Sequence, residues 1–281
     1  MKLLPVVALL FTFIVSGYPQ TPRQDVYEVY AIEYAASDAR VPLKNVAVNA
    51  TSSDSISFSF YIWLLKGEGG RRVLVDTGFL KDSTKKGTPP AKYVRPDRAL
   101  QRVHLDGDEI TDVIITHPHY DHIGGLDLFK KATVWMQQAD YEYLVGGAWQ
   151  EGGNNRGLDK RDVLKIVQLN LDGRLRLVRG DSVEILPGIR AFTGSRHTFT
   201  SQHLLVSTAT ERVLLASDDV WFYYNLQNLL AAALAFDRDA YVREMKRMKT
   251  LVSSPDLIIP GHDALVLTKF PSVAEGVVRI R

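Results

Sequence analysis

Cysteine is absent from this sequence. Disulfides, thiolate metal sites and the lipid-modified cysteine of a lipoprotein are therefore all excluded. An exported protein of this sequence must take its stability from its core and not from covalent cross-links. With 281 residues, 46% of them apolar, the chain is long enough to build a sizeable core.

The sequence has little surplus charge, because 34 Lys and Arg nearly balance 32 Asp and Glu. The basic residues are dispersed, apart from small groups such as Lys85-Lys86 and the stretch 243–249. In that stretch the charged residues are interrupted by the apolar Met245 and Met248, a pattern typical of a helix with a solvated face. Nucleic-acid-binding proteins usually carry a basic stripe, so we expect no nucleic-acid partner.

A long apolar run is also missing beyond the amino terminus, so we expect no stable membrane span. Met1-Lys2 precedes about thirteen mostly apolar residues, a length typical of a signal peptide and short of the roughly 20 that span a bilayer. Ser16-Gly17 then supplies small residues for cleavage. We predict a signal peptide over 1–20, a single domain over 21–281, and export to the periplasm or the medium.

The most informative stretch follows the apolar run 113–115 and puts three histidines and an aspartate within six positions. Histidines at i and i+2 on an extended segment point to the same side. His117 and His119 are therefore predicted to bind one cation. Asp121 and His122 follow where the chain turns, and we expect them to face a second cation.

Further metal-type ligands stand at later strand ends. His197 follows a run of short strands, Asp218 ends the predicted strand 212–217, and His262 follows a buried strand. Seven such ligands suit two cations with one bridging carboxylate. Two zinc ions fit best by ligand type, and iron, manganese or cobalt would also be accepted.

Other positions leave alternatives open. Asp76 is either a plain turn carboxylate or a hydrogen-bond partner of a ligand histidine. The Gly- and Asn-rich loop 146–159 is either an active-site lid or a mobile connection. His104 and His203 are interpreted as structural.

Apolar periodicity and turn residues predict an alternation of strands and helices. The predicted strands are 27–34, 57–65, 72–76, 113–115, 133–136, 175–178, 183–186, 189–192, 203–208, 212–217 and, as the last one, 256–260. The predicted helices are 125–131, 138–145, 225–236 and 239–251, and residues 81–98 are predicted to form a surface loop.

The His-x-His-x-Asp-His pattern at 117–122, with His197, Asp218 and His262, resembles the metallo-β-lactamase superfamily over essentially the whole mature chain. This resemblance implies an α/β fold, a four-layer αββα sandwich with a dinuclear site at one edge of its two sheets. The domain 21–281 would then be a single metallo-hydrolase domain.

Within that superfamily the sequence is most similar to N-acyl homoserine lactonases, through 117–125, 216–218 and 260–263. An aspartate at 218 also differs from true β-lactamases, which usually have cysteine or serine there. The resemblance implies one zinc on His117, His119 and His197, another on Asp121, His122 and His262, and a bridging Asp218.

The implied activity is hydrolysis of the ester bond of lactones, most of all N-acyl homoserine lactones, which amounts to quorum quenching. A metal-bridging hydroxide would attack the carbonyl, and Asp121 would assist protonation of the leaving alkoxide as the catalytic residue. Many lactonases have a tyrosine three residues after the bridging aspartate, but this position is Trp221. We therefore expect Trp221, Tyr223 or Tyr224 to contact the substrate.

Other functions of the same superfamily remain open. An exported phosphotriesterase or aryl-esterase would share this ligand set. A thioesterase of the glyoxalase II kind is disfavoured, because only Arg279 and Arg281 stand near the carboxyl end, where those enzymes usually have a basic patch. A metal-binding protein without catalysis would also retain the fold. The expected partner is a small lactone or ester, and an oligomer is possible.

Overall fold

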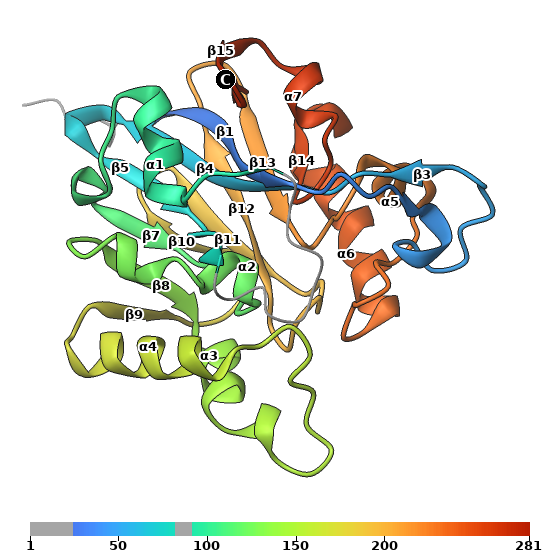
Figure 1. The fold of residues 1–281 in the computed structure, drawn as a ribbon, viewed down its shortest axis with the longest axis horizontal. Coiled ribbons are helices and arrows are strands. Elements are labelled where there is room, and N and C mark those ends of the chain that lie inside the picture. Colours follow the sequence, from blue (N-terminus) through green and yellow to red (C-terminus); the bar gives the residue numbers. More distant parts are fainter. Residues whose placement is uncertain (1–24, 82–91) are drawn as a thin grey trace, which may run out of the picture.

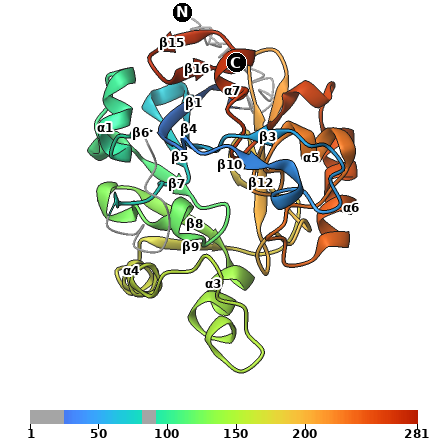
Figure 2. The same ribbon diagram turned by 45° about the vertical axis from the view of Figure 1, so that its right-hand side comes forward.

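Two β-sheets pack face to face in the computed structural model, which describes residues 25–81 and 92–281 (Figure 1). The predicted signal peptide and most of the predicted loop 81–98 lie outside the described residues. Helices cover the outer face of each sheet (Figures 1 and 2).

The larger sheet consists of nine strands within the described ranges. These are β1 (Tyr27–Ala36), β4 (Ser59–Gly67), β5 (Arg72–Val75), β6 (Lys92–Tyr93), β7 (Asp112–Ile114), β8 (Thr133–Gln137), β9 (Leu175–Val178), β15 (Ser272–Ala274) and β16 (Val277–Arg279). Their order is β15-β16-β1-β4-β5-β7-β8-β9, and β6 pairs with β1. The neighbours from β5 to β9 run parallel.

The smaller sheet has five described strands: β10 (Val183–Leu186), β11 (Ile189–Thr193), β12 (Gln202–Ser207), β13 (Arg212–Ser217) and β14 (Ile258–Pro260). They lie in chain order, antiparallel except for the parallel pair β13 and β14. A separate pair, β2 (Val41–Pro42) and β3 (Ser55–Ile56), lies beside α5 in Figure 1.

The α-helices of the described residues are α1 (Pro96–Leu100), α2 (Tyr120–Ile123), α3 (Gln138–Val145), α4 (Lys160–Leu171), α5 (Tyr223–Asn228), α6 (Arg238–Leu251) and α7 (Val266–Lys269). None of them is long and apolar enough to cross a membrane.

Three apolar cores separate four layers. The first lies under α1, α3 and α4 and contains Leu100 and Ile166. The second fills the space between the sheets, where Trp63 is buried. The third lies under α5 and α6, where Tyr241 and Met245 are buried. Each sheet thus buries both faces, as the predicted four-layer αββα sandwich requires.

Most predicted strands are present within two residues of their expected ends, but three predictions are wrong. The predicted helix 225–236 stops at Asn228, because Leu229 adopts a left-handed backbone with φ 52° and Ala232 pairs with Ala47 across an isolated bridge. The predicted helix 125–131 is a single 3-10 turn at Leu126–Leu128. The strand at 256–260 is followed by β15 and β16, so it is not the last.

The helix α4 was not predicted, and α1 begins before the end of the predicted loop, ahead of the stretch around His104 that was expected to be helical. Within the expected loop 81–98, Pro96 begins α1, since its fixed φ suits the first helical position. Asp159 begins α4 by accepting a hydrogen bond from the Arg161 backbone N–H, and Ile166 and Leu169 pack on the sheet. The capping aspartate and the spacing of these apolar residues are the sequence signal that identifies α4.

Gly125 provides a test of how tightly the histidine-rich segment packs. A Cβ atom at this position would collide with the Thr77 carbonyl oxygen. We expect Gly125→Ala to lower the free energy of unfolding, measured with urea, by about 2 to 3 kcal/mol, as overpacking does. The control is Gly152→Ala, where a Cβ atom meets no neighbour and only the positive φ is penalised, by about 1 kcal/mol. Equal losses in both variants would contradict the tight packing at Gly125.

Candidate metal centre

Four strand ends meet at one edge of the sandwich. β5 and β7 run parallel in one sheet, and β13 and β14 run parallel in the other. Parallel strands finish at the same edge of a sheet, so the segments that follow them are neighbours. These segments carry Asp76 after β5, the histidine-rich stretch after β7, Asp218 after β13 and His262 after β14. The fifth contributor, His197, lies in the connection from β11 to β12.

The first group of side chains consists of His117, His119, His197 and Asp218, whose ligand atoms all lie within 4.8 Å of one another. His119 Nδ1 is 3.1 Å from the Nε2 atoms of both His117 and His197. His197 Nε2 is also 3.1 Å from Asp218 Oδ2. Three imidazole nitrogens and a carboxylate oxygen thus converge on one place.

The second group consists of Asp121, His122 and His262, again with ligand atoms within 4.8 Å of one another. Asp218 Oδ1 lies 2.9 Å from His262 Nε2 and 3.3 Å from His122 Nε2. Because Oδ2 of the same carboxylate faces the first group, Asp218 stands between the two groups. All seven predicted ligands are therefore brought together, and their role as ligands stays a prediction.

The donor atoms suit two bound cations. His122 Nε2 and Asp218 Oδ1 are buried and have no hydrogen-bond partner among the described residues. A buried polar atom without a partner is costly, and a cation at the second group, which both atoms face, would supply the missing partner. Imidazole and carboxylate donors in sets of three or four match zinc and similar metals. The arrangement therefore fits a dinuclear metal centre.

The electrostatics of the two groups differ. Burial, reinforced by neighbouring histidines, lowers the pKa of His117 and His119 well below the usual range, so both rings are neutral and free to coordinate. Burial also opposes the charge on His122 and His262. Asp218 and Asp121 outweigh this effect and raise the pKa of both rings. A cation at the second group therefore replaces protons.

Hydrogen bonds from surrounding residues fix the ligand rings. Asp76 Oδ2 lies 2.8 Å from His122 Nδ1, which supports the second of the two alternatives for this aspartate. Thr116 donates its backbone N–H to Asp76 Oδ1 at 2.8 Å, and Ser217 donates its hydroxyl to Oδ2 at 3.1 Å. His262 Nδ1 lies 3.0 Å from the Ser59 carbonyl oxygen. The sequence alone does not show these contacts, because Thr116 and Ser217 meet Asp76, and Ser59 meets His262, only in the fold.

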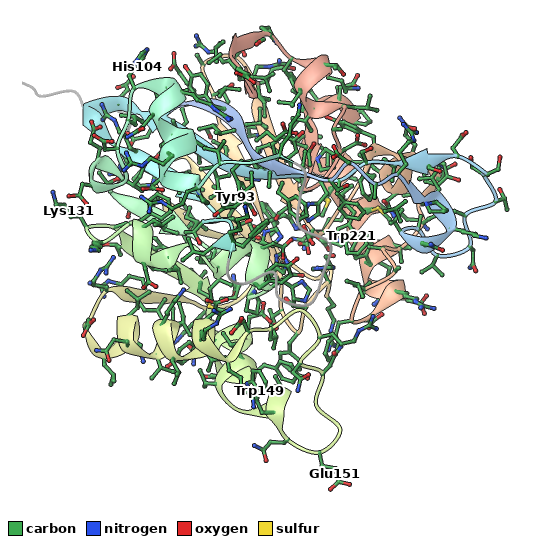
Figure 3. The ribbon with its side chains drawn as sticks, in the orientation of Figure 1. Tyr93, His104, Lys131, Trp149, Glu151 and Trp221 are labelled. Carbon is green, nitrogen blue, oxygen red and sulfur yellow. The ribbon has the colours of Figure 1, made fainter. Side chains whose placement is uncertain are left out.

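The structure separates the three aromatic residues expected to contact a substrate. Trp221 donates its indole N–H to Asp218 Oδ2 at 2.7 Å and lies in the interior (Figure 3). Tyr223 instead packs between the two sheets, where the Lys269 ammonium stands 4.7 Å from its ring centre. Tyr224 packs against the core under α5 and α6. Of the three, Trp221 is the one with a hydrogen bond to a predicted ligand.

The two remaining histidines lie apart from both ligand groups. His104 is exposed at the edge of the molecule, as Figure 3 shows. His203 is buried, with Nδ1 3.0 Å from Asp219 Oδ2 and its ring stacked on Phe192.

The loop 146–159 forms a wall beside the first group. Gly157 accepts a hydrogen bond from the Tyr120 backbone N–H at 2.9 Å. Gly157 has φ 77°, and a Cβ atom there would lie 2.6 Å from His119 Cδ2. Only glycine therefore lets the loop lie against this ring. The loop and the segments 198–199 and 233–238 enclose a pocket of about 160 Å³ that reaches His119 and His197.

The comparisons with known proteins agree with this geometry. The sequence profile of the metallo-β-lactamase superfamily matches residues 55–262. An N-acyl homoserine lactonase of a Bacillus species is 27% identical over 248 residues, 82% of this chain and 92% of that protein. The N-acyl homoserine lactonase AttM of Rhizobium radiobacter is 26% identical over 182 residues, 63% of this chain and 66% of that protein.

Solved structures share the fold. A Bacillus thuringiensis AiiA mutant with N-decanoyl-L-homoserine bound at its active site superposes with a TM-score of 0.70 at 21% identity, covering 88% of this chain and 98% of its own. AidC, a dizinc quorum-quenching lactonase, superposes with a TM-score of 0.62 at 15% identity, covering 86% of this chain and 92% of its own.

Asp76 generates a prediction about metal affinity. Asp76→Asn keeps the size of the side chain but removes the charge that orients the His122 ring. We expect metal affinity at the second group to fall about 10- to 100-fold, as for other partners of ligand histidines. Isothermal titration calorimetry with zinc should then resolve one tight site and one weakened site. Asp112→Asn is the control, since Asp112 accepts from Trp135 instead, and two unchanged sites in Asp76→Asn would contradict the role of Asp76.

Asp140 generates a prediction about pH. Burial raises the pKa of this carboxyl to about 6, although Thr198 and Thr200 donate hydrogen bonds to it. The folded state therefore binds a proton that the unfolded state has lost, so stability falls as the pH rises from about 4 to about 6.

Asn at 140 has the same shape and does not titrate. Relative to the wild type, Asp140→Asn without metal should gain about 2 kcal/mol of unfolding free energy between pH 4.5 and pH 7. Urea denaturation at both pH values measures this difference. If the stability of the two proteins changed equally with pH, Asp140 would be charged in the folded protein at both pH values, which would contradict the prediction.

Proposed function

The chain belongs to the metallo-β-lactamase superfamily, and we propose that it is a metal-dependent lactonase that hydrolyses N-acyl homoserine lactones. The observation that carries this proposal is the Asp218 carboxylate, whose two oxygens face two separate groups of metal-type ligands. The relatives named as N-acyl homoserine lactonases support the substrate class, since the Bacillus protein matches over 92% of its length.

Two divalent cations, zinc by ligand type, would polarise the lactone carbonyl and bring the pKa of a bound water toward neutrality. His117, His119 and His197 would hold one ion, and Asp121, His122 and His262 the other. The neutral state of the His117 and His119 rings leaves their nitrogens ready to coordinate.

Asp121 is the proposed proton carrier for the leaving alkoxide. Its side chain is 12% exposed, against 4% for Asp218, so it is the more accessible carboxylate of the centre. Asp121 Oδ2 stands 3.6 Å from His122 Nε2 and 3.7 Å from His262 Nε2, so a proton on it can reach both the second group and solvent. A carboxylate at such a boundary is suited to general acid catalysis.

Trp221 has a different role from the tyrosine usual at this position. Its indole N–H is engaged by Asp218 and is not free to donate to a substrate carbonyl. Trp221 therefore holds the bridging carboxylate, and its ring, 5.8 Å from the His197 ring, forms part of the wall of the centre. With a signal peptide, the enzyme would act outside the cytoplasm, where lactone signals from other cells arrive, and the result would be quorum quenching.

The direct test is to add N-hexanoyl homoserine lactone to zinc-loaded protein and to measure the release of acid by titration at constant pH. Ring opening produces a carboxylic acid, so each turnover releases about one proton near neutral pH. We expect His119→Ala to lower the rate by at least 100-fold, because it removes a ligand that the first group shares. His104→Ala is the matched control, since His104 is exposed and far from the centre.

Well-folded protein with two bound zinc ions and no acid release would exclude the lactonase assignment. Phosphotriesters and aryl esters would then be the next substrates, because the same ligand set serves those reactions. Turnover that survives in His119→Ala would contradict the metal centre as the site of hydrolysis.

A further inference from the structure

The pocket beside the metal centre is lined by two arginines that have no anionic partner within residues 25–81 and 92–281. Arg156 and Arg238 both line it, and neither forms an ion pair with a described residue. We infer, on the premise that the protein is a lactonase, that its preferred substrate carries an anionic group, such as a carboxylate, at the far end of its acyl chain. Guanidinium groups bind carboxylates through paired, charge-assisted hydrogen bonds.

The acidic residues near these arginines are already engaged. Asp140 lines the pocket, but it accepts hydrogen bonds from the Thr198 hydroxyl at 2.7 Å and the Thr200 backbone N–H at 2.8 Å. Asp237 precedes Arg238 and accepts from the Ala240 backbone N–H at 2.9 Å. The pocket therefore keeps a positive surplus, which metal ions at His119 and His197 would increase.

Both arginines lie on segments whose backbone is hydrogen-bonded to segments that carry predicted metal ligands. Arg156 precedes Gly157, whose carbonyl oxygen binds the backbone N–H of Tyr120, next to His119. Two residues before Arg238, Phe236 donates its backbone N–H to the carbonyl oxygens of Arg196 and His197 at 3.0 and 3.1 Å. An anion held by the arginines would thus sit at a fixed place relative to the reacting ester.

Three aromatic rings line the same pocket. Tyr143 and Phe199 stack at 4.5 Å, and Phe236 meets both edge-on at 5.8 and 5.9 Å. The Arg196 guanidinium stands 5.4 and 5.2 Å from the centres of the Phe199 and Phe236 rings, so a third cation lies close to this aromatic cluster. Such a surface suits an apolar chain segment.

The pocket has room for a segment of an acyl chain, with an accessible volume of about 160 Å³. A short acyl chain that ends in an acid therefore fills the apolar part and places its charge at the arginines. A long neutral chain would leave both guanidinium groups without a partner.

The test compares two lactones that differ at one group. Homoserine lactone is acylated with a six-carbon chain that ends either in a carboxylate or in the corresponding primary amide, a neutral group of equal size. We expect kcat/KM for the carboxylate to exceed that for the amide by at least tenfold at low salt, and the ratio to fall as salt is added. Arg156→Gln and Arg238→Gln should each lower kcat/KM for the carboxylate at least fivefold and change that for the amide less than twofold.

Arg176→Gln is the charge-matched control, because Arg176 is exposed on β9 and binds the Gly173 carbonyl oxygen outside the pocket. Equal kcat/KM for the two lactones, or arginine variants that lower both equally, would overturn the inference and leave the lactonase proposal standing. Zinc-loaded protein that hydrolyses neither compound nor N-hexanoyl homoserine lactone would instead defeat the lactonase proposal itself.

Discussion

The buried carboxylate of Asp218 is the constraint on which the rest of the centre depends. A charged group removed from water costs several kcal/mol unless partners replace the lost hydration. The Trp221 indole and the imidazoles of His197 and His262 surround this carboxylate within 3.1 Å. The backbone carbonyl of Asp218 also accepts a hydrogen bond from the buried Tyr241 hydroxyl at 2.9 Å. The carboxylate thus organises side chains from both sheets, and cations on either side would complete its coordination.

The scaffold accepts local strain to make this arrangement. Asp76 and Ser217 both have left-handed backbones, with φ 60° and 47°, at the ends of β5 and β13. Non-glycine residues in this region cost about 1 to 2 kcal/mol each, and such strain is commonly found at functional sites. Gly261 shows the same demand for space, since a Cβ atom there would lie 2.7 Å from Asp218 Oδ1. Strand ends, turns and ligands therefore form one unit.

The sequence could predict most of the centre because its ligands follow recognisable strands. Periodicity located those strands, and the two-residue spacing of His117 and His119 on an extended segment required no knowledge of the fold. The Trp221 contact with Asp218 was beyond such reasoning, because it depends on how the chain turns after β13. Tyr223, two residues later, points into the core between the sheets for the same reason. The predicted helix 225–236 failed because its apolar residues serve bridge and wall positions and not one helical face.

The pocket could not be predicted, since its walls come from five segments that are separated in sequence. In the sequence Gly157 is an ordinary loop glycine, and only the structure shows how closely its backbone approaches the His119 ring. Arg156 and Arg238 likewise look like ordinary surface charges in the sequence. Only the fold shows that they line one cavity beside a metal-dependent hydrolase centre. The residues predicted to bind metal thus belong to local sequence motifs, whereas those that would select the substrate depend on tertiary structure.

The central claim is that Asp218 lies between two metal ions. Anomalous diffraction at the zinc absorption edge, from crystals of zinc-loaded protein, tests it most directly. Two peaks per chain are predicted, one among His117, His119 and His197 and one among Asp121, His122 and His262, with Asp218 beside both. A single peak, or two peaks of which Asp218 contacts only one, would contradict the dinuclear centre.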